Sequence, residues 1–193
     1  MGYEDEVWWS RLAQPHLSAW AETGESLRLV EKTVAKDDPD PKALACYGLL
    51  VRSCTVAGPT TEEVWLRFVE GRPVSAATVP FLTWCCERLA AAGKRALLLV
   101  WDNASWHLSK QVRDWVREHN RAVKETGSGV RIMVCALPVK SPWLNPIEPK
   151  WVHGKRAVAE PVRVLTAQEL EDRVCAYYCC QPIAHLTYSE KVS

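Results

Sequence analysis

The sequence predicts an α/β fold in which a mixed sheet carries helices on both faces. The first 70 residues read mainly as strands, and the rest alternates between helical and strand patterns, an order that such layers accommodate. Of the 193 residues, 48% are hydrophobic and 24% are charged, close to the averages of globular proteins. The length fits one domain, and the composition excludes disordered, collagen-like and coiled-coil proteins.

Strands are predicted in the first part of the chain. Residues 3–10 mix acidic and aromatic side chains, residues 43–52 form a continuous apolar run, and residues 64–69 alternate between apolar and polar side chains. A further short strand is expected near residues 26–32. Residues 36–42 are expected to form a loop, because their two prolines and three aspartates oppose regular structure.

Helical spacing of apolar residues replaces the strand pattern near residue 78. Thr78 is expected to cap this first helix, Pro80 to lie in its first turn and Gly93 to end it. Residues 96–101 are expected to form a strand that is buried on both faces. The apolar stripe of the first helix consists of Phe81, Leu82, Cys85, Cys86 and Leu89.

Three more helices and one strand complete the expected order. Residues 109–124 read as an amphipathic helix, and residues 130–137 read as a strand that follows a glycine-rich turn. Residues 145–157 read as a helix with Asn145 as its N-cap. The last helix, residues 166–178, begins with a Thr-x-x-Glu capping box, and the tail after it is expected to be loose.

No membrane or secretory segment is visible, and the cysteines are therefore expected to be reduced in a cytoplasmic protein. The longest aliphatic run, residues 96–100, is far shorter than the ~20 residues of a membrane helix. The acidic N-terminus lacks the apolar stretch of a signal peptide. Cys175, Cys179 and Cys180 cluster near His185, but no second ligand pair accompanies them, so a zinc site is not expected. Core positions are expected for Cys46, Cys85, Cys86 and Cys135.

Nine of the ten tryptophans fall into two groups. Those on predicted strands and helices are expected in the core. Those beside polar motifs could instead stack on nucleic-acid bases or shape a site, although core packing is the commoner role. The first group contains Trp8, Trp9, Trp65, Trp84, Trp101 and Trp115, and the second contains Trp106, Trp143 and Trp151.

Positive charge is concentrated in one segment of a nearly neutral chain. The net charge is +1, but residues 107–156 carry 10 Lys and Arg against 4 Asp and Glu. Arg113, Arg117 and Arg121 recur every four residues and form a basic row on one helix face. Such a segment suits contact with a polyanion, and a solvated helix face would explain the same charge equally well.

Carboxylates stand at three informative places. Asp102 directly follows the predicted buried strand, and open α/β sheets bind ligands at the carboxyl ends of their strands, although a turn or cap role is the alternative. Glu148 lies between two prolines in a first helical turn, where capping is the alternative. In the first strand, side-chain alternation separates Asp5 from Glu4 and Glu6, and spacing alone does not choose between the faces. Such acids suit Mg²⁺, which prefers oxygen ligands.

Three blocks of the sequence together resemble a known family. YEDEVWW, LLLVWDNASWH and LPVKSPWLNPIEPKW resemble, in order, the catalytic blocks of mariner-like bacterial insertion-sequence transposases, which belong to the DDE superfamily and have an RNase H-like fold. The resemblance spans residues 3 to about 157. It implies that Asp5, Asp102 and Glu148 are the catalytic residues and bind two Mg²⁺ or Mn²⁺ ions. The residues expected to shape the site are Asn103, His107 and Asn145.

The resemblance also implies a DNA transposition activity. Such an enzyme cleaves DNA phosphodiesters and transfers 3′-hydroxyl strand ends, with element ends and target DNA as partners and a homo-oligomer in the DNA complex. Residues 1–160 would form the catalytic domain, and residues 161–193 would form a C-terminal helix and tail. Because the family's N-terminal helix-turn-helix region is not seen, we expect a truncated catalytic fragment, cytoplasmic and associated with the nucleoid. DNA contacts are expected from Lys110, Arg113, Arg117, Arg121, Lys140, Lys150, Lys155 and Arg156.

Two other functions remain open from the sequence. A catalytically silent remnant that binds DNA or dimerises with a full-length relative would keep the same acids and the same basic row. Another RNase H-like nuclease, acting on RNA–DNA hybrids or branched DNA, is less consistent with the sequences of the motifs. Assays of cleavage, binding and substrate competition would separate these functions.

Overall fold

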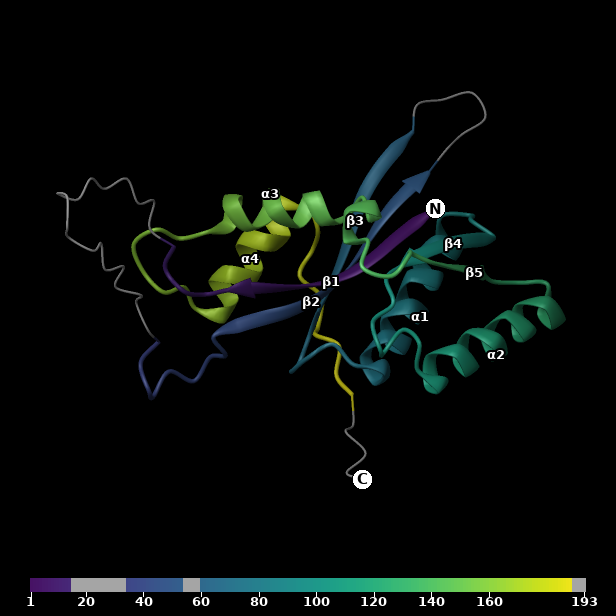
Figure 1. Cartoon of the computed structure of the whole chain (residues 1–193), viewed down its shortest axis with the longest axis horizontal. Helices are drawn as coiled ribbons and strands as arrows, with labels where there is room; N and C mark the ends of the chain where they lie inside the picture. Colours follow the sequence, from purple (N-terminus) through teal and green to yellow (C-terminus); the bar gives the residue numbers. More distant parts are fainter. Residues whose placement is uncertain (15–33, 54–59, 189–193) are drawn as a thin grey trace.

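A five-stranded mixed sheet forms the centre of the protein (Figure 1). The computed structural model describes residues 1–14, 34–53 and 60–188, so the strand expected near residues 26–32 lies outside the described residues. The strand order is β3-β2-β1-β4-β5. β1 pairs antiparallel with β2 and parallel with β4, β2 pairs antiparallel with β3, and β4 pairs parallel with β5. The strands are β1 (Gly2–Ser10), β2 (Ala43–Ser53), β3 (Thr61–Val69), β4 (Ala96–Trp101) and β5 (Arg131–Ala136).

Helices cover both faces of the sheet, as the sequence predicts. Figure 1 shows α1 and α2 together near β4 and β5, and α3 and α4 together towards the other end. Apolar side chains of β2 and β4 form one core with α1, and apolar side chains of β1, β2 and β3 form a second core with α3 and α4. The helices are α1 (Ser75–Ala91), α2 (Lys110–Thr126), the short 3₁₀ helix η1 (Pro142–Leu144), α3 (Glu148–Val158) and α4 (Ala167–Tyr177).

The first helix begins earlier than its sequence suggests. Its N-cap is Val74, so Thr78 and Pro80 lie inside α1 and the predicted cap at Thr78 is wrong. Thr78 is buried, and its hydroxyl contacts both the carbonyl of Val74 (3.2 Å) and the hydroxyl of Tyr47 (3.1 Å). Because the Tyr47 hydroxyl also accepts the Val74 N–H at 3.1 Å, a contact from β2 fixes the start of the helix.

The start of α3 also differs from the prediction. The helix begins at Glu148 with Ile147 as N-cap, so Asn145 is not its cap. Asn145 is buried, and its side-chain amide donates to the carbonyl of Glu4 at 2.9 Å. A polar residue that favours N-caps in general is thus used here to join α3 to β1. The capping box predicted for the last helix is confirmed at Thr166.

The chain after α4 is ordered against β3 up to residue 188, so the prediction of a loose tail is wrong for these residues. Leu186 is buried and forms a β-bridge with Val69. Its N–H donates to the Phe68 carbonyl at 2.7 Å, and its own carbonyl accepts the Glu70 N–H at 2.9 Å. The edge strand β3 therefore gains backbone partners that local sequence patterns do not reveal.

Two residues predicted in the core lie at the surface. Trp8 is 47% exposed, because it lies on the face of β1 opposite to the buried Trp9. Cys135 is exposed on the edge strand β5. Within the described ranges, Glu4, Glu6 and His107 alone form a group of three or more potential metal-ligating side chains. No helix in these ranges is long and apolar enough to cross a membrane.

Candidate active site

The two strands that carry Asp5 and Asp102 lie side by side in the sheet. In their parallel ladder Gly2 is opposite Leu99 and Tyr3 is opposite Val100. The ladder ends with this pair, so Asp5 on β1 and Asp102 after β4 each lie two residues beyond it. Asp102 follows the last residue of β4, where a sheet exposes side chains to ligands.

Helix α3 carries the third predicted acid and packs against β1. Glu148 is its first residue, and Trp151 follows one turn later. The indole Nε1 of Trp151 donates to Oδ2 of Asp5 at 2.8 Å. The bond between Asn145 and the carbonyl of Glu4 fixes the segment just before the helix. These two contacts from α3 and its approach hold Glu148 near β1.

Electrostatic interactions connect Glu148 with each of the other two predicted acids. Burial, followed by the negative charges of Glu148 and Glu4, raises the pKa of Asp5 to about 8. Burial also raises the pKa of Glu148, with Lys155 opposing this rise and Asp102 adding to it. Glu148 therefore repels Asp5, and Asp102 repels Glu148. A divalent cation would offset this repulsion.

Gly48 explains how the indole of Trp151 reaches Asp5. Gly48 is opposite Asp5 in the antiparallel ladder of β1 and β2. A Cβ atom at this position would overlap the Trp151 ring and also press on Ile147. The missing side chain lets the indole lie directly on β2, where the ring is buried and meets Trp9 edge-on at 6.1 Å.

The other face of β1 carries Glu4 and Glu6, and both meet His107. The Nε2 of His107 lies 3.1 Å from Oε1 of Glu6 and 3.0 Å from Oε2 of Glu4, while its Nδ1 lies 3.0 Å from Oδ1 of Asp102. Trp106 donates to Oε1 of Glu6 at 2.7 Å. Side-chain alternation left open which face of β1 lies towards Glu148. The structure places Asp5 on that face and the two glutamates on the face towards His107.

Burial and neighbouring groups shift the pKa values of three side chains in this cluster. Burial opposes the charged form of His107, but the Glu4 charge and the hydrogen bonds to Asp102 and Glu6 raise its pKa far above the usual value. Burial and the Glu6 charge raise the pKa of Glu4 to about 7. The His107 hydrogen bond in turn lowers the pKa of Asp102.

The group formed by Glu4, Glu6 and His107 has the spacing of a metal site, and both His107 nitrogens are already paired with carboxylates. One ligand atom from each residue lies within 4.8 Å of the others. Both His107 nitrogens face carboxylate oxygens, and a doubly protonated ring satisfies these contacts. Glu4 is fully buried and neither oxygen accepts an aligned hydrogen bond, so its 3.0 Å contact with His107 is ionic.

Each residue that was expected to shape the site contacts a neighbouring segment. Asn103 donates to the carbonyl of Leu137 at 2.6 Å and joins the end of β4 to the loop after β5. His107 and Asn145 make the contacts given above. The sequence offered Glu6 as a candidate acid and Trp106 and Trp151 as residues that could shape a site, but it did not predict their hydrogen bonds, which Glu6 makes with His107 and Trp106 and which Trp151 makes with Asp5.

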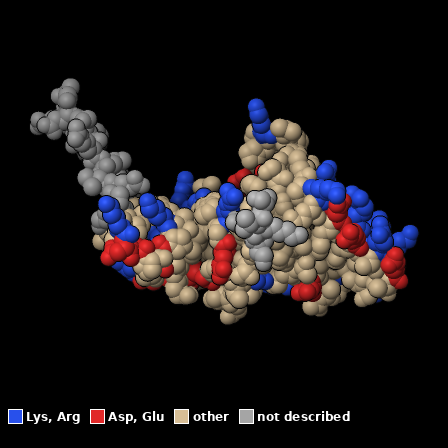
Figure 2. Space-filling model, turned by 90° about the horizontal axis from the view of Figure 1, so that it is seen from below, with Lys and Arg blue, Asp and Glu red and all other residues tan. Residues whose placement is uncertain are grey.

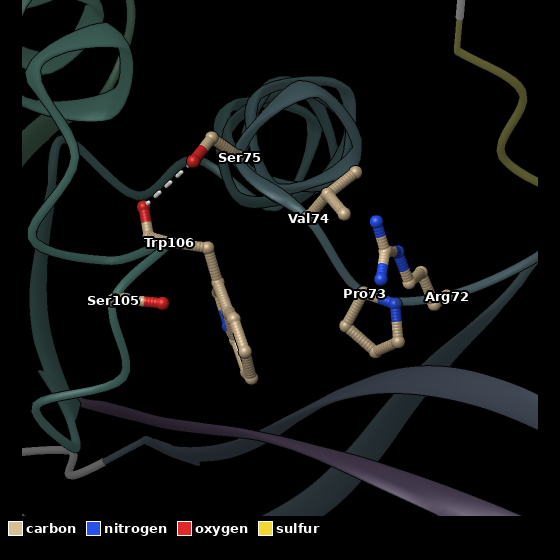
Figure 3. Close-up of a pocket in the computed structure, with 6 residues that line it drawn as sticks. All are labelled: Arg72, Pro73, Val74, Ser75, Ser105 and Trp106. Atoms are coloured by element: carbon tan, nitrogen blue, oxygen red, sulfur yellow. Dashed lines mark hydrogen bonds between the residues drawn. The ribbon is translucent and has the colours of Figure 1, made fainter. Parts of the chain in front are cut away.

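Two hollows border the motif that contains Asp102. One, of about 350 Å³, lies between the start of α1 and the loop before α2. Figure 3 shows the Trp106 ring and the Arg72 side chain on opposite sides of this hollow, with the Ser75 hydroxyl bonded to the Trp106 carbonyl at 3.3 Å. The other, of about 320 Å³, is lined by Asp102 and by the loop of residues 137–142. Trp143, next to that loop, is 74% exposed.

The predicted DNA-binding residues occupy separate parts of the surface. Lys110, Arg113, Arg117 and Arg121 are exposed on α2, and Figure 2 shows Lys and Arg side chains gathered at this end of the molecule with acidic ones among them. Arg117 pairs with Asp114 at 3.1 Å. On α3, Lys155 and Arg156 are exposed, while Lys150 pairs with Glu62 of β3 at 3.0 Å. Lys140 is exposed in the loop after β5.

Comparisons with known structures identify the fold. The protein is similar to the Mos1 transposase in its paired-end complex with the left transposon end, at a TM-score of 0.61 and 13% identity, over 94% of this chain and 48% of that chain. The Mos1 mariner paired-end complex with Mn matches at a TM-score of 0.59 and 13% identity, over 94% of this chain and 48% of that chain. The Mos1 Strand Transfer Complex matches at a TM-score of 0.58 and 12% identity, over 94% of this chain and 47% of that chain. The sheet and helices are those of the RNase H-like fold.

The chain spans about half the length of these Mos1 structures. A comparison with curated proteins finds no match. The family model described as DDE superfamily endonuclease matches residues 3–171, which include all three predicted acids. Because this match covers most of the sequence, the protein belongs to the DDE superfamily endonucleases.

Proposed function

We propose that this protein is the catalytic domain of a DDE transposase, which cleaves DNA phosphodiesters and joins 3′-hydroxyl ends to target DNA. The observation that carries the proposal is that Asp5, Asp102 and Glu148 come from three separate elements, while the charge of Glu148 raises the pKa of Asp5 and the charge of Asp102 raises the pKa of Glu148. Family membership and the Mos1-like fold support the same chemistry. Element ends, target DNA and further copies of the chain would be its partners.

The donor set fits hard divalent cations. Glu148 raises the pKa of Asp5 and Asp102 raises the pKa of Glu148, and the Asp102 side chain is half exposed and open to solvent. Oxygen ligands of this kind suit Mg²⁺ and Mn²⁺. We assign the binding of two such ions to Asp5, Asp102 and Glu148. When bound in pairs, these ions assist attack by one oxygen and departure of another in phosphodiester chemistry.

The chain's own residues prepare this site. Trp151 donates to Oδ2 of Asp5 and leaves Oδ1 available to a ligand. His107 and the Ala104 N–H both donate to Oδ1 of Asp102, which favours its ionised form. Glu148, as the first residue of α3, is carried on a rigid helix whose position depends on Asn145. No protein nucleophile is needed, because water or a DNA 3′-hydroxyl attacks the phosphate.

A nicking assay with the whole chain tests this function. The wild-type protein is expected to nick supercoiled DNA with Mg²⁺ or Mn²⁺ and to stop when EDTA removes the metal. Asp102→Asn and Glu148→Gln should each lower the rate by at least about 100-fold, because each removes a charge that holds the metal. DNA affinity, measured by fluorescence anisotropy, should be retained in both variants.

Undiminished nicking in both variants would exclude these acids from the chemistry. Binding to DNA without any cleavage by the wild-type protein would instead favour the catalytically silent remnant. Preferential cleavage of RNA–DNA hybrids in a competition assay would favour the third function considered above.

The basic row on α2 is expected to bind DNA through phosphates. Arg113, Arg117 and Arg121 are exposed, and each phosphate contact releases counterions on binding. Replacing all three with Gln should weaken DNA binding about equally for all sequences and reduce the slope of log affinity against log salt by up to about 3. Glu118→Gln and Glu125→Gln on the same helix serve as controls, since they should not weaken binding.

A further inference from the structure

The oxygens of Asp102 have different surroundings. Oδ1 receives two hydrogen bonds, from the Ala104 N–H at 2.8 Å and from His107 Nδ1 at 3.0 Å. Within the described ranges, Oδ2 has no such donor, and the side chain is 50% exposed. One oxygen is therefore held by the protein while the other faces the site. This orientation depends on His107, because the backbone N–H alone would leave the carboxylate free to turn.

The His107 ring is itself held on every side. Its side chain is 1% exposed and lies flat on Trp101, with ring centroids 4.5 Å apart and an angle of 5° between the planes. Nε2 contacts Oε1 of Glu6, and that oxygen is fixed in turn by the Trp106 indole at 2.7 Å. Glu4 lies 3.0 Å from the same Nε2. The ring has no room to rotate and keeps Nδ1 pointed at Asp102.

These contacts form one chain of hydrogen bonds between the two strands that carry predicted metal ligands. Trp106, Glu6, His107 and Asp102 follow one another in this chain, and Glu6 is the neighbour of Asp5 on β1. The separation of Asp5 and Asp102 is thus fixed on the face of β1 opposite to Glu148. Side chains that orient metal ligands in this way typically change metal affinity about 10–100-fold when they are replaced.

We propose that Glu6 and His107 are positioning residues, which hold Oδ1 of Asp102 so that Oδ2 is presented to the catalytic metal. The proposal rests on the function proposed above and names the residues that build its metal site. Neither residue touches the metal or the DNA. Glu6 acts through His107, and His107 acts through Asp102.

Binding of Mn²⁺ to the whole chain tests this proposal without any DNA. Electron paramagnetic resonance of free Mn²⁺ gives the dissociation constant directly. His107→Ala and Glu6→Ala are each expected to weaken Mn²⁺ binding about 10–100-fold. Glu6→Gln keeps an acceptor oxygen for His107 and should stay within about 3-fold of the wild type, and added imidazole should restore much of the affinity of His107→Ala.

His119→Ala is the matched control. Like His107, His119 stacks on a tryptophan, Trp115, at 5.0 Å and 21°, and it bonds a backbone carbonyl, that of Val130, at 2.8 Å. It has no contact with the three acids in the described residues. Thermal unfolding of each variant reports folding, and His119→Ala should lose stability without loss of Mn²⁺ affinity. In nicking assays, His107→Ala should raise the half-saturating Mn²⁺ concentration and leave the KM for DNA unchanged.

The outcomes separate this proposal from the function on which it rests. Wild-type protein that binds no Mn²⁺, or an Asp102→Asn variant that binds it equally well, would overturn the proposed function. Wild-type binding that is lost in Asp102→Asn but unchanged in folded His107→Ala and Glu6→Ala would overturn the positioning role alone. If His107→Ala does not fold, the comparison of Glu6→Ala with Glu6→Gln decides, and equal affinities would overturn the positioning role.

Discussion

Asp5→Asn is expected to abolish nicking and, at the same time, to stabilise the metal-free protein at alkaline pH. Burial and the nearby Glu148 raise the pKa of Asp5 to about 8, against about 4 for an ordinary aspartate. Between these values the folded protein keeps a proton that the unfolded chain has lost. The stability that this proton contributes is fully present below about pH 4 and is lost as the pH rises through about 8. Asparagine resembles the protonated acid and removes this loss.

Thermal unfolding in EDTA between pH 5 and pH 9 measures the effect. Asp5→Asn should unfold at a higher temperature than the wild type at pH 9, and the difference should shrink towards pH 5. Each kcal/mol that is relieved raises the midpoint by about 2–4 °C in a chain of this size. Mn²⁺ should raise the midpoint of the wild type but much less that of the variant, because a ligand stabilises only the state that binds it.

Asp114→Asn on α2 is the control for this comparison. Asp114 pairs with Arg117 and Lys110 at the surface of α2 and contacts none of the three acids in the described residues. Its replacement should give no stabilisation that grows with pH and no loss of nicking. If Asp5→Asn is less stable than the wild type at pH 9, burial and repulsion do not destabilise the charged carboxylate. If the variant still nicks DNA, Asp5 is not part of the catalytic site.

Gly48→Ala is expected to lower both stability and nicking. The added Cβ would overlap the Trp151 ring and crowd Ile147, so the indole or β2 must move. Overpacking of a buried site costs typically about 1–3 kcal/mol in the free energy of unfolding. Displacement of the indole also removes the hydrogen bond to Oδ2 of Asp5 and shifts the helix that carries Glu148. Denaturant unfolding and the nicking assay measure the two effects.

A double-mutant cycle shows whether the indole is the cause. In a Trp151→Leu background the Gly48→Ala replacement should cost clearly less than in the wild type, because the smaller side chain leaves room for the Cβ. Contacting residues typically couple by about 0.5–3 kcal/mol in such cycles. Equal costs in the two backgrounds would mean that the glycine is required for another reason, such as the conformation of β2.

Helix starts show where reading of local sequence failed. Thr78 and Asn145 are residue types that favour N-caps, and neither serves as one. Thr78 bonds Tyr47 of β2, and Asn145 bonds the backbone of β1. Both hydrogen bonds join residues distant in the chain, so propensity does not reveal them. Thr166 caps α4 as predicted, because its partner Glu169 is only three residues away.

The sequence by itself determined the fold class and the family. Runs of apolar residues and their spacing are local properties, and they suffice to order the strands and helices along the chain. The sequences of the three motifs pointed to Asp5, Asp102 and Glu148. The family model matches residues 3–171, which include all three acids. The role of these acids as metal ligands remains a prediction.

Only the tertiary structure decided which face of β1 looks towards Glu148. Alternation separates Asp5 from Glu4 and Glu6, but both faces of this central strand are covered, so burial pattern alone gives no preference. Packing of Trp151 against Gly48 turns Asp5 towards α3, and His107 takes up the two glutamates on the other side. These contacts join residues that lie between 101 and 146 positions apart, and only the folded chain brings such residues together.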